Sequence, residues 1–198
     1  MSKKLTFILL LHLILISCKK SEQKNTPKIE IYLIENRITS HQGIEINESN
    51  IDSLKLRELS NRFDFNIVRF DTLKSELIFA GEFKADKTDL KEKAFISNNE
   101  ILSFDHNNGN LKIDSIAIQK LNEIKPNGYG IQFALLVDDS PELFGYFYPT
   151  IYSTLCSTFH YNPSVKSNDE LELYYGKNWE NADLKSQRKS LYKKLNKN

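Results

Sequence analysis

Two neighbouring aspartates could bind a cation. Asp138 and Asp139 follow a long apolar run and could offer carboxylate oxygens to Ca²⁺. A calcium site needs six to eight oxygen ligands, and no spaced acidic loop accompanies this pair. We therefore interpret Asp138 and Asp139 as turn residues.

Cys156 and His160 have the residue types of a nucleophile and its base, four positions apart. In the strand predicted there, four residues separate side chains on one face by about 13 Å, too far for a hydrogen bond. Cys156 is better interpreted as a buried thiol near core aromatic residues. His41 and His106 fall in predicted loops without the histidine spacing of zinc sites. The sequence therefore predicts no metal site, no cofactor and no catalytic group, although an enzyme with an unrecognised site stays an alternative.

Aromatic residues near position 146 could form a binding surface. Tyr146 and Tyr148 lie two residues apart in a predicted strand and therefore share one face. Core packing with satisfied hydroxyl groups is the default interpretation. The alternative is an exposed surface for a peptide or protein partner, formed by Tyr146, Tyr148, Tyr152 and Trp179, because aromatic side chains dominate interface anchors.

A predicted β-hairpin over residues 130–149 positions these groups. Its first arm, 131–137, is a nearly unbroken apolar run with branched residues, which indicates a buried strand. Asp138-Asp139-Ser140-Pro141 has the composition of a turn. The aromatic second arm, 143–148, ends before Pro149. If the hairpin has a function, we expect the exposed aromatic face of this second arm to carry it.

Shorter elements are predicted on both sides of the hairpin. Alternation of apolar and polar residues indicates strands, whereas spacing of three to four residues with capping groups indicates helices. Residues 84–94 are charged and predict a solvated connector. Strands are expected at 29–34, 63–70, 77–83, 101–104 and 111–113, with two more between 152 and 175, and helices at 51–59, 115–124 and 181–195. This order predicts an α+β fold, an antiparallel sheet with helices packed on one face, in a single domain.

The first eighteen residues resemble a bacterial lipoprotein signal. Lys3 and Lys4 precede a run from Leu5 to Ile16 that is apolar apart from two residues, and Ser17-Cys18 follows. We expect residues 1–17 to be a signal peptide, 18–28 a lipidated Cys18 with its tether, and 29–198 the globular domain. An ordinary signal peptide and an uncleaved anchor are the alternatives, but twelve residues fall short of the roughly 20 that span a bilayer.

The charge balance limits the classes of partner that we expect, and the cysteine content limits the disulfides. The chain has 27 basic and 26 acidic residues, and loss of residues 1–17 removes two lysines and no acid, leaving 25 against 26. This balance argues against nucleic acid as a partner, because phosphate neutralisation needs clustered positive charge. The lysines of 185–197 are interpreted as a solvated helix face, with adhesion to anionic headgroups as the alternative. After lipidation only Cys156 remains as a thiol, so no internal disulfide is expected.

The region from about 95 to 176 resembles known proteins. A helix at 115–124, the arm Gln132 to Asp139 and the aromatic return to Pro149 resemble the first periplasmic domain of SecD, a protein-export subunit. Gly145 to Pro149 with Ser153 to Cys156 is similar to small envelope lipoproteins of unknown function that carry Gly-Tyr-Phe-Trp-Pro and Ser-Cys. The resemblance implies an α+β fold and no known catalytic residues. Asp139 replaces the turn glycine of SecD and nothing in the sequence resembles SecD's membrane helices, so the translocase role is not carried over.

These observations lead to one hypothesis with alternatives. We expect a protein of the bacterial cell envelope that carries a lipid (palmitate) on Cys18, faces the periplasm and works without catalysis as a binding or accessory module. A membrane-tethered inhibitor or immunity-type protein is equally compatible with a small lipoprotein. The sequence leaves open whether the inner or the outer membrane holds the anchor.

Overall fold

The computed structural model describes residues 27–105, 109–149, 155–163 and 169–175, together with the isolated positions Lys189 and Lys193. Two α-helices, three short 3₁₀ helices and a set of mostly short strands lie within them. In chain order these are β1 (Ile29–Leu33), β2 (Ile44–Glu45), η1 (Ile46–Glu48), α2 (Ser53–Ser60), β3 (Arg69–Asp71), β4 (Glu76–Ile78), η2 (Lys87–Asp89), η3 (Asn98–Glu100), β5 (Ile101–Phe104), β6 (Leu111–Ile113), α3 (Ser115–Glu123), β7 (Ile131–Val137), β8 (Ser140–Phe147), β9 (Phe159–Tyr161), β10 (Glu170–Leu171) and β11 (Leu173–Tyr175).

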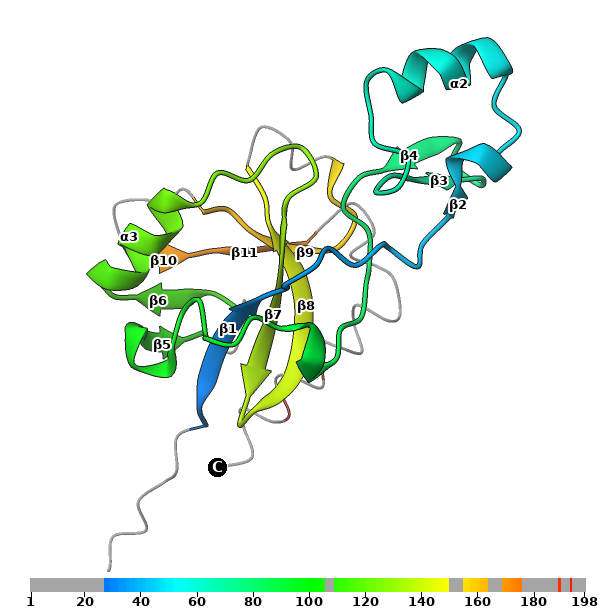
Figure 1. Cartoon of the computed structure of the whole chain (residues 1–198). Helices are drawn as coiled ribbons and strands as arrows, with labels where there is room; N and C mark the ends of the chain where they lie inside the picture. Colours follow the sequence, from blue (N-terminus) through cyan, green and yellow to red (C-terminus); the bar gives the residue numbers. More distant parts are fainter. Residues whose placement is uncertain are drawn as a thin grey trace, which may run out of the picture.

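A five-stranded sheet in the order β1-β7-β8-β9-β11 organises the body of the protein (Figure 1). Its neighbours are antiparallel except β8 and β9, which are parallel. The predicted single-domain α+β class with mainly antiparallel sheets is confirmed. The hairpin of β7 and β8 lies at the centre, and Asp138 and Asp139 both have positive φ angles, 49° and 62°. Such a turn matches the right-handed twist of the two strands that it joins.

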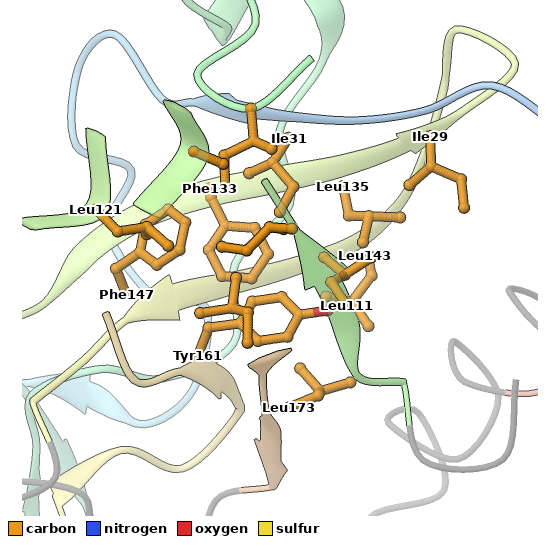
Figure 2. Packing of buried hydrophobic residues seen from close by; sticks show 14 of the residues in the cluster. Ile29, Ile31, Leu111, Leu121, Phe133, Leu135, Leu143, Phe147, Tyr161 and Leu173 are labelled. Carbon is orange, nitrogen blue, oxygen red and sulfur yellow. The ribbon is translucent and has the colours of Figure 1, made fainter. Parts of the chain in front are cut away.

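One face of the central sheet packs against α3 and a second sheet in the order β10-β6-β5. Three rings fill the middle of this layer: Phe133 lies 5.0 Å from Phe147 and 5.4 Å from Tyr161 between ring centroids (Figure 2). Leu121 of α3 also belongs to this buried cluster. Each large apolar side chain buried in this way contributes about 1.5–3 kcal/mol. The cluster is therefore the main source of stability in the described residues.

The opposite face of the central sheet is covered as well. Tyr146, Tyr148 and Cys156 are buried there against Phe83 and Ala85 from the segment that precedes η2. A strand with two covered faces needs apolar residues at successive positions, which explains the nearly unbroken run of β7. The prediction that the first arm of the hairpin belongs to the core is confirmed.

The charged connector predicted at 84–94 runs along the outer edge of β1. Glu35 donates its backbone N–H to Asp89, Lys91 donates to Leu33, and Phe95 donates to Ile31. The lysines of the segment are exposed, as predicted, but Ala85 is buried and anchors it. The connector thus protects an edge strand whose backbone groups would otherwise be open to pairing with another chain.

Residues 44–79 form a separate small lobe at one side of the body (Figure 1). It contains α2 and a sheet in the order β2-β3-β4, around a core of Ile46, Val68 and Phe79. The predicted helix near 51–59 is confirmed, with Asp52 as its cap. The strand predicted from residue 63 is wrong over 63–67, because the Asp64 side chain accepts the Asn66 N–H and closes a tight turn.

Candidate binding groove

The two tyrosines predicted to form an exposed binding surface are buried, which corrects that expectation. Tyr146 is 1% exposed and Tyr148 is 0% exposed. The Tyr146 hydroxyl donates to the Gly81 carbonyl at 2.8 Å and accepts from the Gln132 amide at 3.1 Å, while the Tyr148 hydroxyl donates to the Gly128 carbonyl. Burial raises the pKa of the Tyr146 phenol. The expectation failed because both faces of the hairpin are covered, so neither of its two sets of side chains is left for a partner.

Three other predicted site residues lie outside the described residues. They are Cys18 with its signal peptide, Tyr152 and Trp179, and the helix predicted over 181–195 also falls outside apart from Lys189 and Lys193. Lipidation of Cys18 and any role of Tyr152 and Trp179 therefore stay predictions.

Cys156 and His160 do not form a nucleophile and base. The Cys156 thiol donates to the Thr158 carbonyl at 3.6 Å, and His160 Nδ1 lies 3.4 Å from the same oxygen. Burial raises the pKa of the Cys156 thiol to about 12 and lowers the pKa of the His160 imidazole. A thiolate is therefore strongly disfavoured at neutral pH, and the interpretation of Cys156 as a buried thiol is confirmed.

Asp138 and Asp139 act as turn residues, as predicted. The Asp138 carboxylate accepts the backbone N–H of Lys28 at 2.9 Å, and the Lys28 ammonium donates to Asp139 at 3.0 Å. Among the described residues, no three histidine, cysteine or acidic side chains are grouped so that they could hold a metal ion.

A polar cluster around Glu82 was not anticipated from the sequence. The buried Glu82 carboxylate accepts from the Gln42 amide at 2.8 Å and lies 3.7 Å from His41 Nε2. The Ser157 hydroxyl donates to Gln42 at 2.9 Å, and the Ser40 hydroxyl donates to the Glu82 carbonyl. No described hydroxyl or thiol forms a hydrogen bond with the His41 ring, so the cluster lacks the contact between nucleophile and base that covalent catalysis requires. Its bonds instead fasten the segment around Gln42 to the body.

A groove of about 570 Å³ lies in the small lobe, between α2 and the sheet of β3 and β4. Phe70 and Leu77 are direct partners in the register of β3 and β4, so their side chains share the sheet face that lines the groove. Ile51 and Leu59 line it from the helix side. A cavity of this size lies within the range of ligand sites in proteins.

The border of the groove is polar and carries one cation without an ion pair. The lining residues include Asn50, Asp52, Lys55, Thr72 and Ser75. Asp52 accepts the N–H groups of Leu54 and Lys55 as the helix cap, so its carboxylate is already engaged. Lys55 forms no ion pair with any other residue in the described part of the chain.

The two most exposed large apolar side chains of the described residues are sequence neighbours of this lining. Leu54 in α2 is 78% exposed, and Leu73 in the turn between β3 and β4 is 96% exposed. No residue of α2 is buried. The apolar surface of the lobe therefore extends beyond the groove, where water covers it at a cost in free energy.

Arg37 joins the lobe to the body. Its guanidinium donates to the Phe79 carbonyl at the end of the lobe and to the Tyr129 and Gly130 carbonyls before β7, at 2.8 to 3.2 Å. The same group lies 5.6 Å from the ring centroid of Tyr146. Tyr129 in turn accepts the Asp64 N–H from within the lobe. These contacts connect the lobe that holds the groove to the central sheet.

The sequence interpretation missed the groove. The spacing of residues 51–59 favours a helix, with an alternating strand over Leu54-Lys55-Leu56 as the alternative, and residues 63–70 predict a strand, but neither pattern indicates that the two segments enclose a groove. Leu73 is the residue that could have indicated an exposed apolar surface, because the residues around it in the segment Asp71-Thr72-Leu73-Lys74-Ser75 are polar.

Comparison of the chain with protein-family models, curated proteins and solved structures gives no match. The resemblance to SecD and to small envelope lipoproteins therefore stays a prediction. Among the residues that the structure describes, none belongs to a helix with the length and apolar character needed to cross a bilayer.

Proposed function

We propose that this chain is a lipid-anchored, non-catalytic binding module of the bacterial cell envelope, and that the groove between α2 and β3–β4 is its binding site. The observation that carries the proposal is an open groove with an apolar floor and two exposed leucines beside it. Proteins seldom leave such surface uncovered without a use for it. The aromatic side chains Tyr146, Phe147 and Tyr148 of the hairpin, by contrast, are buried in the core.

The position of the lobe agrees with an anchor at the N-terminal side. The tether ends at Lys28, where β1 begins at the end of the body away from the lobe (Figure 1). Lys28 is fastened to the hairpin turn through its backbone and its ammonium group. A protein attached to a membrane through Cys18 would thus hold the groove away from the bilayer.

The anchor is tested by labelling cells that express the chain with a radioactive or clickable fatty acid. We expect label on the wild type and on Cys156→Ala, and none on Cys18→Ala. Label that is absent from the wild type, or equal on Cys18→Ala, would contradict lipidation at this residue.

The groove is tested by placing a photo-crosslinking amino acid at single exposed positions. Leu54 and Leu73 report on the lobe, while Leu102 and Ile116, which are 58% and 55% exposed, are matched apolar positions on the body. We expect a discrete crosslinked product in the cell envelope from the two lobe positions and none from the two body positions. Products of equal yield from all four positions, or from the body alone, would contradict the proposal.

A further inference from the structure

We propose that the groove takes a peptide segment of a protein partner that presents apolar side chains to Phe70 and Leu77 and one carboxylate to Lys55. This inference rests on the proposed function, because it assigns a ligand class to the same site. Three features of the lobe support it in turn: its incomplete core, its charge and its hydrogen-bonding border.

The core of the lobe is incomplete. Its cluster of buried apolar residues comprises only Ile46, Val68 and Phe79, whereas Ile51, Leu56, Phe70 and Leu77 are only half-buried around them. An isolated helix as short as the eight residues of α2 is unstable in water, and α2 buries none of its side chains. Apolar side chains inserted between α2 and the sheet would supply the missing contacts.

Lys55 is the lining cation that could pair with an anionic partner group. Two of the arginines in the lobe are engaged, Arg62 with Glu58 and Arg69 with Glu45. Lys55 lines the groove and forms no ion pair within the described residues. Asp52 also lines the groove and its carboxylate stays anionic, but it accepts the N–H groups of Leu54 and Lys55 as the helix cap, so the Lys55 ammonium is the charged lining group with free hydrogen-bond donors for a ligand.

The border of the groove favours a peptide over an acyl chain. Asn50, Thr72 and Ser75 line it, and their side chains form no hydrogen bond with another described residue. These exposed amide and hydroxyl groups can pair with the N–H and C=O groups of a peptide, whereas a hydrocarbon chain has no group that could bond to them. Leu54 and Leu73 extend the apolar surface beyond a single small ligand. An apolar centre within a polar border is the usual arrangement of a protein interface.

The test is selection from a random twelve-residue peptide display library against the full lipoprotein held in detergent. We expect enriched peptides with at least two large apolar residues and an aspartate or glutamate. Lys55→Glu should weaken their binding about fivefold, as for an exposed ion pair, and a lysine in place of the peptide acid should restore it. Thr72→Trp should fill the groove and reduce binding more than tenfold, whereas Ser103→Trp, at an exposed position of β5, should leave binding unchanged.

Several results would overturn the inference. Selection that enriches no peptide, or enriches basic peptides, contradicts it, and so does equal binding to the wild type and Thr72→Trp. Octanoate serves as a second probe: if it binds in the groove by NMR while no peptide is enriched, the ligand is a small apolar acid. In that case the groove remains the binding site and only the peptide assignment fails. Crosslinked products of equal yield from the body and lobe positions would instead contradict the proposed function itself.

Discussion

Replacing Tyr146 by phenylalanine tests whether this residue belongs to the core or to a binding surface. The change removes one buried hydroxyl and leaves the ring in place. That hydroxyl donates to the Gly81 carbonyl at 2.8 Å and accepts from the Gln132 amide at 3.1 Å. The Gln132 amide keeps its second bond, to the Ile38 carbonyl at 2.7 Å. The Gly81 carbonyl loses this donor.

The expected loss of stability follows from these contacts. A buried polar group that loses its partner costs about 1–3 kcal/mol. We expect Tyr146→Phe to lower the free energy of unfolding by about 2 kcal/mol. For a chain of this length, such a loss lowers Tm by roughly 4–8 °C.

Urea unfolding followed by circular dichroism measures the change. Tyr32→Phe is the matched control, because the Tyr32 hydroxyl donates to the Glu30 carboxylate at 3.2 Å, and that carboxylate keeps its ion pair with Lys28 at 2.9 Å when the hydroxyl is removed. Its cost should stay below about 0.5 kcal/mol. Crosslinking from Leu54 should be unchanged in folded Tyr146→Phe. Equal, small losses in both variants, or a loss of the crosslinked product at full stability, would refute the burial of Tyr146 on which this reasoning depends.

Three further predictions concern the body. Gly145→Ala should cost about 1–3 kcal/mol, because a Cβ there would lie 2.6 Å from a carbonyl oxygen of β9, whereas Gly128→Ala, with open space around it, should cost far less in the same urea unfolding assay. In a Cys18→Ala background, the Cys156 thiol should react with Ellman's reagent at pH 8 only after unfolding, since burial raises its pKa to about 12; fast reaction of the native protein would contradict this. Burial alone would raise the pKa of the Glu100 carboxyl, but hydrogen bonds led by the one from Lys120 hold it below its usual value. The pair therefore stabilises the fold above pH ~4.3 and loses this contribution as the pH falls. Because Lys120 is one-third exposed, Lys120→Met should cost about 1.5 kcal/mol at pH 7 and much less at pH 3, and an equal cost at both pH values would contradict the ion pair.

Local signals in the sequence were sufficient for the body of the fold. The apolar run of β7, the turn at Asp138-Asp139 and helix α3 each depend on residues close in sequence, and each was predicted. Contacts between distant segments were not predictable in the same way. Phe83 and Ala85 cover the second face of the hairpin and lie more than sixty residues before Tyr146 in the sequence, so residues near the hairpin do not indicate that Tyr146 is buried.

The lobe shows why the site itself was missed. Its groove forms between a helix and two strands of three residues each, which are too short to give a clear alternating pattern. The segment around Asp64 has the sequence pattern of a strand, because its phenylalanines alternate with polar residues. The structure has a turn there instead, since the Asp64 side chain accepts a backbone hydrogen bond from Asn66. Apolar residues at a binding surface are exposed in the free protein, so they depart from the usual pattern of buried apolar and exposed polar residues.

The most direct test of the groove as binding site combines the crosslinker at Leu54 with a substitution that fills the groove. In cells that express this chain, Thr72→Trp should abolish the crosslinked product, and Ser103→Trp should leave its yield unchanged. Persistence of the product in Thr72→Trp at the wild-type yield would contradict binding in the groove.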